Sequence, residues 1–363
     1  MKEIKPEAIH SILVICPNWV GDFVMATPTF RSLRQVLPGS QITLFVKPSL
    51  AKLAEGAEWC DRIFLYDRNR LHKGFWGWCR LWNWFRTQKF DLAFVLPNSL
   101  RSGLIGKLSG ARYRIGYDRT GGVFCLSHRL KRLKEGKRFL PIYMGYYYGK
   151  LFEAFFPGTV KQDLDLPLLP DQDRFARGYW DKVQPQGSAL RIAIAPGASY
   201  GSSKLWPTAY YATLIHLLGN EYRPKMLLVP GPGEEMIAKD ISSLAQYPIS
   251  ILPTKQGKLD VLKSFIAQAD LLICNDSGAR HIAHAFGVRT VVLMGPTDPR
   301  HSENPEAPYE VLRNAVPCAP CHLKRCPYDH HACMTGLDPN QAFHASQNFL
   351  EQVKFDKSLL VEK

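Results

Sequence analysis

The sequence lacks the segments that carry a chain into or across a membrane. No apolar run reaches the roughly 18–20 residues that a transmembrane helix needs, and the charged start of the chain, residues 1–10, has no secretory hydrophobic region. The nine cysteines lie mostly within expected strands and helices, which is typical of buried, reduced thiols. These absences predict a protein that stays in the cytoplasm.

Acidic residues are scarce in one part of the chain, which we call the basic stretch (residues 101–138). It holds only Asp118 and Glu135 against eleven lysines and arginines, and the whole chain has a formal net charge of +14. Such a stretch favours a polyanionic partner: nucleic acid, an anionic membrane or a phosphorylated substrate. A merely solvated basic face is the alternative.

The composition is that of a globular protein with room for two domains. Hydrophobic residues make up 46% and charged residues 21% of the 363 residues. Continuous Ile/Leu/Val runs alternate with segments of helical period, which predicts doubly wound α/β domains with parallel sheets. The expected strands are 11–16, 41–46, 62–66, 91–96 and 113–117 in the first half, and 191–195, 225–229, 249–252, 270–274, 290–294 and 309–312 in the second.

We expect the first domain at residues 1–170 and the second at 171–338, connected through the Pro- and Asp-rich residues 161–186. A helix within residues 339–363 should end the chain. In doubly wound sheets, ligands bind at the carboxyl ends of strands, so the loops that follow the strands are the candidate sites. The first such loop, residues 17–22, ends on Asp22. That carboxylate is either a helix cap or a catalytic base.

The corresponding loop of the second half is rich in small and hydroxylated residues. Residues 196–204, which we call the serine loop, contain Ser199, Ser202, Ser203 and Lys204. Exposed backbone N–H groups, hydroxyls and one ammonium suit a diphosphate. The next loop carries Glu234 and Glu235, which either accept from ribose hydroxyls or stabilise the following helix.

A further constellation follows the expected strand 270–274. Asp276 should lie at the sheet edge, Ser277 and Gly278 at a helix N-terminus, and His281 on its first turn. The helix N-terminus favours a phosphate, and Asp276 can accept from sugar hydroxyls. We expect His281 to contact the ligand and His284 to be structural.

These motifs together resemble the ADP-heptose:lipopolysaccharide heptosyltransferases of glycosyltransferase family 9, and the second type (II) more than the first. The resemblance rests on Asn-Trp-Val-Gly-Asp at 18–22, Leu-Pro-Asn-Ser at 96–99, Arg-Ile-Gly-Tyr at 114–117, Asn-Asp-Ser-Gly at 275–278 and Gly-Pro-Thr-Asp-Pro at 295–299. It runs in order along nearly the whole chain. It implies a GT-B fold: two facing Rossmann-like domains, with a C-terminal helix that returns to the first.

The resemblance also implies an activity and its residues. A heptose would pass with inversion from ADP-heptose, bound by the second domain, to the phosphorylated heptosyl-Kdo2-lipid A core, bound by the first. Asp22 would be the general base, and Lys204 and Ser199 would contact phosphate. Asp276, Gly278 and His281 would bind the donor, and Glu234 or Glu235 would bind ribose. The expected acceptor contacts are Asn18, Asn98, Arg101, Arg112, Arg114 and Arg119.

Two alternatives remain open. One is a heptosyltransferase I or III, which uses a different core acceptor. The other is a module that binds a nucleotide sugar or nucleic acid without turnover, although the basic stretch contains no recognised nucleic-acid reading motif. We therefore expect no nucleic-acid partner, and a peripheral contact with the cytoplasmic face of the inner membrane.

No cofactor is expected for catalysis. The donor loops contain no Asp-x-Asp pair, so Lys204, His281 and a helix N-terminus should supply the positive charge that a metal ion would otherwise give to the departing diphosphate. Cys318, Cys321, Cys326 and Cys333 have the density of a structural zinc site, interleaved with histidines. Reduced cysteines that pack a loop are the other interpretation. The aromatic residues 75–85 should form a helix buried on both of its aromatic faces.

Overall fold

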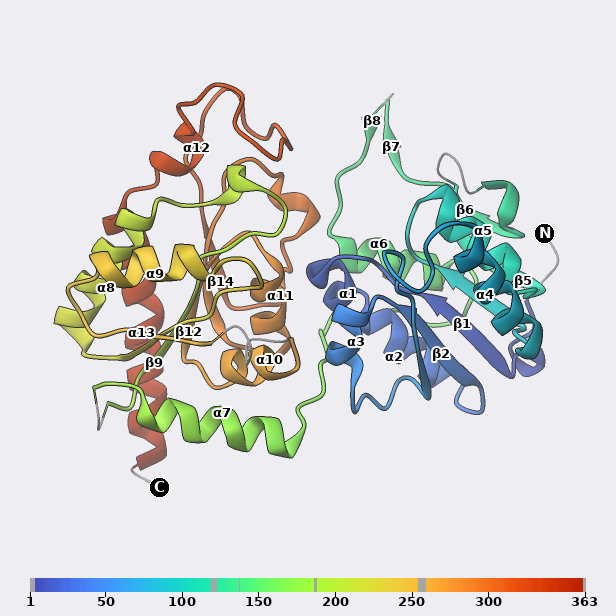
Figure 1. The fold of residues 1–363 in the computed structure, drawn as a ribbon, viewed down its shortest axis with the longest axis horizontal. Helices are drawn as coiled ribbons and strands as arrows, with labels where there is room; N and C mark the ends of the chain where they lie inside the picture. The colour runs from blue at the N-terminus through green and yellow to red at the C-terminus, as the bar shows by residue number, and fades with distance from the viewer. Residues whose placement is uncertain (1–3, 119–122, 137, 186–187, 254–258, 362–363) are drawn as a thin grey trace. The chain divides into compact units, whose positions relative to one another are not determined.

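The chain forms two compact units, each built on its own parallel sheet (Figure 1). The computed structural model describes residues 4–118, 123–136, 138–185, 188–253 and 259–361. The first unit is Met1–Pro167 with Arg300–Asn304, and the second is Leu168–Pro299 with Pro305–Lys363.

In the first unit, six parallel strands pair in the order β3-β2-β1-β4-β5-β6. The strands are β1 (Ser11–Ile15), β2 (Gln41–Val46), β3 (Arg62–Leu65), β4 (Leu92–Val95), β5 (Tyr113–Tyr117) and β6 (His128–Leu130). The helices are α1 (Val20–Met25), α2 (Thr27–Val36), α3 (Pro48–Ala54), α4 (Gly74–Thr87), α5 (Leu100–Leu108) and α6 (Met144–Glu153). Short 3₁₀ turns, η1 (Pro6–Ala8) and η2 (Val123–Cys125), and an antiparallel pair, β7 (Lys134–Glu135) with β8 (Arg138–Phe139), complete the unit.

The second unit repeats this order as β11-β10-β9-β12-β13-β14. Its strands are β9 (Arg191–Ala195), β10 (Lys225–Leu228), β11 (Ser250–Ile251), β12 (Leu271–Asn275), β13 (Arg289–Leu293) and β14 (Tyr309–Leu312). Its helices are α7 (Pro170–Lys182), α8 (Thr208–Tyr222), α9 (Glu235–Leu244), α10 (Leu259–Ala267), α11 (Gly278–Ala285), α12 (Ala332–Thr335) and α13 (Pro339–Val361). The 3₁₀ turn η3 (Ser202–Lys204) lies in this unit, whereas η4 (Pro299–His301) begins here and continues into the residues assigned to the first unit.

The doubly wound fold predicted from the sequence is confirmed in both units, and each of the eleven expected strands is present. Each sheet has a switch point, where the strand order reverses: between β1 and β4 in the first, and between β9 and β12 in the second. Connections leave the two central strands toward opposite faces of the sheet, so a crevice opens at their carboxyl ends. This topology selects four loops as candidate site elements, those after β1, β4, β9 and β12.

The central strands β1, β4, β9 and β12 are largely apolar because both of their faces are covered. Ile192, Ile194, Leu271 and Ile273 of the second sheet are fully buried in one core cluster. Burial of side chains of this size contributes about 1.5–3 kcal/mol each relative to leaving them exposed. The candidate loops after β9 and β12 therefore follow strands that are anchored in the core.

The C-terminal helix α13 belongs to the second unit. Ala342, Ala345, Leu350 and Val353 lie on one side of it and enter the core that also contains the β9 and β12 side chains. This spacing of three to five residues puts them on a single stripe of the helix. The stripe explains why the helix packs on the second sheet.

Helix α4 departs from the expectation that both of its aromatic faces are buried. Phe75, Trp76 and Trp82 expose 74%, 74% and 53% of their surface. The buried face is instead Gly77, Leu81 and Phe85. A Cβ atom on Gly77 would lie 2.2 Å from the backbone carbon of His72, so only glycine lets that segment cross the helix here.

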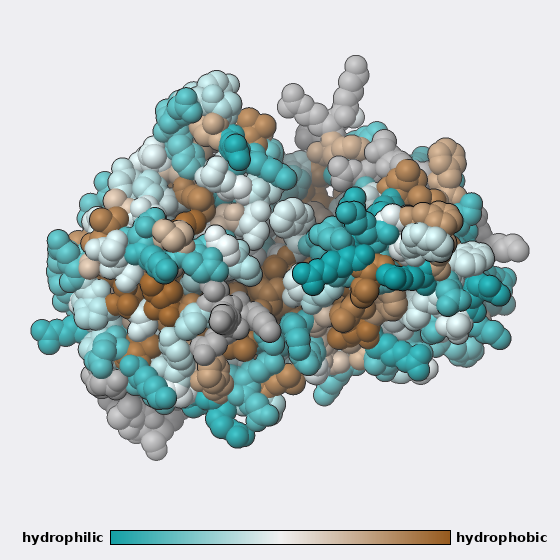
Figure 2. All heavy atoms as spheres, in the orientation of Figure 1, coloured by the Kyte–Doolittle hydropathy of each residue, from teal (hydrophilic) through white to brown (hydrophobic). Residues whose placement is uncertain are grey.

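On the face seen in Figure 2, hydrophobic and hydrophilic residues are interspersed rather than gathered into one apolar band. Among the described residues, no helix is both long and apolar enough to cross a bilayer.

Candidate functional site

Lys204 and Asp276 meet at the switch point of the second sheet. Lys204 ends η3 in the loop after β9, and Asp276 directly follows β12. The Lys204 Nζ donates to Asp276 Oδ2 at 2.5 Å and to the Asp276 backbone oxygen at 2.9 Å. Both side chains are about nine-tenths buried. Lys204 and Asp276, which the sequence predicted to bind the nucleotide sugar, therefore form an ion pair across the crevice.

Two further groups donate to the same carboxylate. Arg280 Nη1 lies 3.1 Å from Oδ1, and the Thr297 hydroxyl lies 2.7 Å from Oδ2. Burial by itself would raise the pKa of Asp276, but the charges of Lys204 and Arg280 and the hydrogen bonds from Lys204 and Thr297 outweigh it and hold the pKa well below its usual range. The carboxylate is thus ionised and fixes two cations at the crevice.

Neither Arg280 nor Thr297 was among the residues predicted from the sequence. Arg280 is fully buried and stands four residues after Asp276, the spacing at which opposite charges meet on a helix. The four-residue spacing between Asp276 and Arg280 could therefore have indicated this ion pair from the sequence. Thr297 reaches the carboxylate from the loop after β13, and only the strand order brings the two together.

Helix α11 begins at Gly278 beside Asp276, with Ser277 as its N-cap. The Ser277 side chain makes no capping hydrogen bond in the described chain, so the first-turn N–H groups keep their capacity to bind an anion. These two residues lie where the sequence placed them.

His281 is buried, and its environment corrects one expectation. Burial, together with the nearby Arg280 and His284, holds the pKa of His281 well below its ordinary value. Its Nδ1 has no hydrogen-bond partner among the described residues. The imidazole is therefore neutral here and cannot supply the positive charge that we predicted for it, but it can supply a hydrogen bond. Burial also lowers the pKa of His284 to about 3, and its ring stacks on Tyr309.

The hydroxyl of Ser203 donates to a backbone carbonyl oxygen, whereas the sequence predicted that it would donate to a phosphate. Ser203 is buried, and its Oγ donates to the Leu323 carbonyl oxygen at 2.5 Å. The carbonyl oxygen of Leu323, 120 residues further along the chain, accepts the hydrogen bond from the Ser203 hydroxyl. Local composition could not show this pairing. Ser199 and Ser202 are exposed in the same loop, and their predicted phosphate contacts stay predictions.

Of the two glutamates considered for ribose, Glu234 is the one that lies on the serine loop. Its Oε2 accepts from the Gly231 backbone N–H at 2.6 Å. A Cβ atom on Gly197 would overlap the Glu234 carboxyl group at 1.7 Å, so the carboxyl group rests directly on Gly197. Burial raises the pKa of Glu234, partly offset by the Gly231 hydrogen bond. Glu235 is the first residue of α9.

In the first unit, Asp22 stands in the first turn of α1, in the loop region after β1. The N-cap of that helix is Trp19, so Asp22 is not the capping residue, although a first-turn carboxylate suits the helix dipole. Burial raises the pKa of Tyr148 on α6, and the nearby Asp22 carboxylate raises it further. Asp22 thus lies beside α6 at the carboxyl edge of the sheet.

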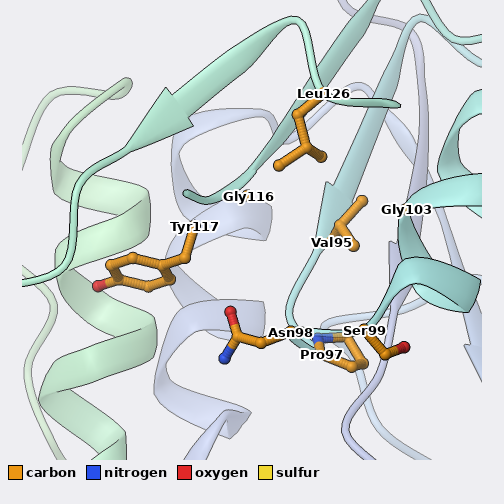
Figure 3. Close-up of a pocket in the computed structure, with 8 residues that line it drawn as sticks. All are labelled: Val95, Pro97, Asn98, Ser99, Gly103, Gly116, Tyr117 and Leu126. Carbon is orange, nitrogen blue, oxygen red and sulfur yellow. The ribbon is translucent and has the colours of Figure 1, made fainter. Parts of the chain in front are cut away.

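Asn98 follows β4 on the other side of the same switch point. Its Oδ1 accepts from the Tyr147 hydroxyl at 3.0 Å, and Tyr147 in turn stacks on Tyr117 with ring centres 3.8 Å apart. Figure 3 shows Asn98 and Tyr117 projecting from neighbouring strand ends. The small cavity between them has a volume of about 10 Å³, room for roughly one water molecule and not for a sugar.

Two of the four arginines predicted to bind the acceptor hold other parts of the first unit. Arg101 donates to the Tyr66 hydroxyl and the His72 carbonyl oxygen, and Arg114 donates to the carbonyl oxygens of Cys125 and Ala111. Both guanidinium groups hold loops of the first unit. Arg112 precedes β5, so it lies at the amino edge of the sheet, opposite Asn98. Arg119 lies outside the described residues.

The structure adds basic groups that the sequence did not single out. Lys47 follows β2, and its Nζ donates to the backbone oxygen of Asn18, itself an exposed residue, at 3.1 Å. Burial and the neighbouring Arg68 lower the pKa of Lys47. A cavity of about 310 Å³ beside α6 is lined by charged, aromatic and aliphatic side chains: Tyr117, Leu130, Lys131, Arg132, Leu133, Leu140, Ile142, Tyr147, Lys150, Glu153 and Ala154.

Residues 78–332 match the sequence profile of glycosyltransferase family 9 (heptosyltransferase). The chain belongs to this family. It is 30% identical over 308 residues to the lipooligosaccharide heptosyltransferase 2 of Haemophilus ducreyi, an alignment that covers 80% of this chain and 85% of that protein. The protein is therefore a glycosyltransferase, as the motifs indicated.

Solved structures of the family share its fold. A family 9 glycosyl transferase from Veillonella parvula matches with a TM-score of 0.80 at 18% identity, over 94% of this chain and 97% of that one. The E. coli ADP-heptose LPS heptosyltransferase II matches with a TM-score of 0.76 at 21% identity, over 95% and 99% of the two chains. The predicted GT-B class is confirmed by these matches.

The cysteine-rich end of this family 9 chain packs beside the serine loop. We call residues 318–333 the cysteine segment. All four of its cysteines are free thiols. Burial raises the pKa of Cys333, and the neighbouring thiols of Cys321, Cys318 and Cys326 raise it further. Within the described ranges, no group of three or more His, Cys, Asp or Glu side chains is arranged to hold a metal ion. A structural zinc ion therefore stays an untested prediction.

Proposed function

We propose that this glycosyltransferase moves a heptose from ADP-heptose onto the heptosyl-Kdo2-lipid A core of lipopolysaccharide. The observation that carries the proposal is the buried charge network on Asp276, which fixes the Lys204 ammonium and the start of α11 at the switch point of the second unit. The names of the matched relatives, which specify heptosyltransferase 2 and ADP-heptose, support the same substrate class.

The donor would bind in the second unit. The Lys204 ammonium and the N–H groups of the first turn of α11 would neutralise the diphosphate, and the neutral His281 would donate or accept a hydrogen bond. Glu234, which lies on Gly197, would accept from the ribose hydroxyls. Asp276 would hold Lys204 in place and accept from the heptose.

The acceptor would bind in the first unit with Asp22 as the general base. The acceptor hydroxyl oxygen attacks the anomeric carbon, its bond forms as the bond to the ADP oxygen breaks, and ADP leaves with the electron pair. The hydroxyl proton passes to the Asp22 carboxylate. One displacement of this kind inverts the anomeric configuration.

We infer that the reaction needs no metal ion. Lys204 and the α11 N-terminus provide the charge that a divalent ion would supply at the leaving group. Turnover should therefore persist in EDTA.

We also propose that the enzyme works at the cytoplasmic face of the inner membrane and contacts it peripherally. The support is α4, whose Phe75, Trp76 and Trp82 are exposed. Lys73 and Arg86, near its two ends, are exposed too. Aromatic side chains flanked by cations are typical of surfaces that bind anionic lipid.

Calorimetry with ADP and with single-stranded RNA separates the transferase from a nucleic-acid-binding module. The proposal predicts saturable binding of ADP alone. A protein that binds the RNA and does not bind ADP would overturn the proposal. The choice between heptosyltransferase II and the related I and III depends on the acceptor, and a product assay with defined acceptors decides it.

A further inference from the structure

The serine loop is held in place by the cysteine segment, about 120 residues further along the chain. Ser203 shows this most clearly, because all three of its polar groups bond to that segment. Its N–H donates to the Lys324 carbonyl oxygen at 3.1 Å, and its hydroxyl donates to the Leu323 carbonyl oxygen at 2.5 Å. Its own carbonyl oxygen lies 2.7 Å from the Nε2 atom of His331. A carbonyl oxygen can only accept, so His331 Nε2 carries the proton.

Contacts on the residues before Ser203 extend the same interface. The Tyr200 hydroxyl donates to the His322 carbonyl oxygen at 2.5 Å. A Cβ atom on Gly201 would lie 2.3 Å from the Lys324 carbonyl oxygen, which is a backbone atom and cannot swing aside. Glycine at position 201 is therefore required for the two segments to approach this closely.

The cysteine segment is itself anchored to the rest of the second unit. The His322 N–H donates to the Pro296 carbonyl oxygen at 2.8 Å, next to the Thr297 that donates to Asp276. At the other end, Cys333 and Met334 are buried in the main core. The segment thus connects fixed parts of the unit to the serine loop.

We propose that residues 322–331 are a positioning clamp for the serine loop, and that they set where the Lys204 ammonium stands for donor binding. Lys204 follows Ser203 directly, and its Nζ lies 5.0 Å from the centre of the Tyr200 ring. The clamp therefore acts on residues directly beside Lys204, the residue proposed to bind the diphosphate. The inference rests on the proposed function in one respect, since its measurements of ADP binding take ADP to be part of the donor. We assign the clamp a positioning role, through its hydrogen bonds to Tyr200 and Ser203.

An isosteric pair at His331 tests the hydrogen bond. His331→Gln keeps an N–H donor at the same number of bonds from the backbone, whereas His331→Met keeps the length and loses the donor. The backbone at position 331 has a left-handed conformation, with a φ of +45°, and both replacement residues must adopt it. We expect His331→Met to raise the Kd for ADP and the KM for the donor roughly three- to tenfold, the effect of one hydrogen bond. The KM for the acceptor should not change, and His331→Gln should restore wild-type values.

A glycine pair tests the close approach. Gly201→Ala should raise the Kd for ADP more than His331→Met does, because the two backbones must separate. Gly178→Ala in α7 is the matched control, since a Cβ atom there meets nothing within 4 Å. It should leave ADP binding at the wild-type value.

Amide hydrogen exchange of residues 199–206, measured without nucleotide, gives a readout that does not depend on the donor. The clamp predicts faster exchange there in His331→Met and Gly201→Ala, and wild-type exchange in His331→Gln and Gly178→Ala. Variants that melt at a lower temperature but keep wild-type ADP affinity and wild-type exchange at 199–206 would overturn the clamp. A wild-type protein that binds no ADP would overturn the proposed function instead, and the exchange data would still decide the clamp.

Discussion

The carboxylate of Asp22 has a single proposed task, to take the proton of the acceptor hydroxyl. Replacing it by Asn keeps the size and removes the base, so Asp22→Asn should lower kcat by roughly 10²–10⁴-fold. The Kd for ADP should stay at its wild-type value, because that ligand is assigned to the other unit. Steady-state kinetics with calorimetry on the same preparation measures both. Near-normal turnover would remove Asp22 from the mechanism.

Lys204 is proposed to serve both the fold and the donor. Lys204→Met leaves a buried carboxylate short of one partner, so the free energy of unfolding should fall by about 3–5 kcal/mol. The Kd for ADP should rise at least about tenfold, since a charge-assisted contact to phosphate is lost.

A second buried lysine provides the matched control. Lys225 begins β10, and its Nζ donates to the carbonyl oxygens of Trp180 and Asp181, away from the switch point. Lys225→Met should cost stability and leave ADP affinity unchanged. Equal loss of ADP affinity in both variants would show that Lys204 acts only through the fold.

His284 should make stability depend on pH. Its pKa is about 3 in the folded protein against about 6.5 when unfolded. The unfolded chain therefore binds the extra proton first, and stability is full above pH 6.5 and falls as the pH drops from there toward 3. The contribution is at most about 1.4 kcal/mol per pH unit for one proton.

His284→Phe keeps the ring against Tyr309 and removes the titration, so the slope of unfolding free energy between pH 7 and pH 4 should flatten. His344→Gln, on the exposed side of α13, is the control and should leave the slope unchanged. Denaturant unfolding at several pH values measures it. An unchanged slope in His284→Phe would contradict the buried neutral imidazole.

The sequence indicated most of these residues but not their partners. Asp22, Glu234, Asp276 and Lys204 follow or end strand-end loops, and a loop after a buried strand is readable from composition. Arg114 and Ser203 were assigned to ligands because each looked like an available donor. Both bond instead to backbone carbonyls, those of Cys125 and Leu323. The Ser203 pairing joins segments 120 residues apart, and the Arg114 pairing depends on the path of the chain between β5 and β6. Local composition shows neither.

Among the elements, the strands with an apolar run were predictable, even the two-residue β11, and the strand without one was not. Strand β6 is three residues, His-Arg-Leu, and carries no apolar run. It forms because β5 offers an unpaired edge. The prediction that both aromatic faces of α4 are buried was also wrong. Helical spacing groups its aromatics well, but Gly77 and the crossing backbone of His72 decide which side turns inward.

Helix α4 carries the prediction about membrane contact. The triple replacement Phe75→Ser, Trp76→Ser and Trp82→Ser should weaken binding to vesicles that contain anionic phospholipid at least about tenfold, because aromatic area at the lipid interface is lost. Co-sedimentation measures it. The control pair Phe175→Ser and Met236→Ser removes exposed hydrophobic side chains from the second unit and should bind as wild type does. Equal binding by the triple variant would exclude α4 as the contact.

For the whole molecule, one architecture appears twice. Both sheets have the strand order of a doubly wound fold, and both bring their candidate site residues to the switch point: Asp22 and Asn98 in the first unit, Lys204 and Asp276 in the second. Alternation of strands and helices predicted the class, while the strand order follows only from the pairing. The order explains why residues from loops 72 positions apart form one ion pair.

The central claim is heptose transfer to an acceptor that already carries one heptose. The purified enzyme would be incubated in EDTA with ADP-heptose and either heptosyl-Kdo2-lipid A or Kdo2-lipid A, and the products read by mass spectrometry. We predict that the first acceptor gains the mass of one heptose as ADP is released, and that the second is unchanged. Transfer to Kdo2-lipid A alone, or no transfer to either acceptor by folded enzyme that binds ADP, would contradict the account.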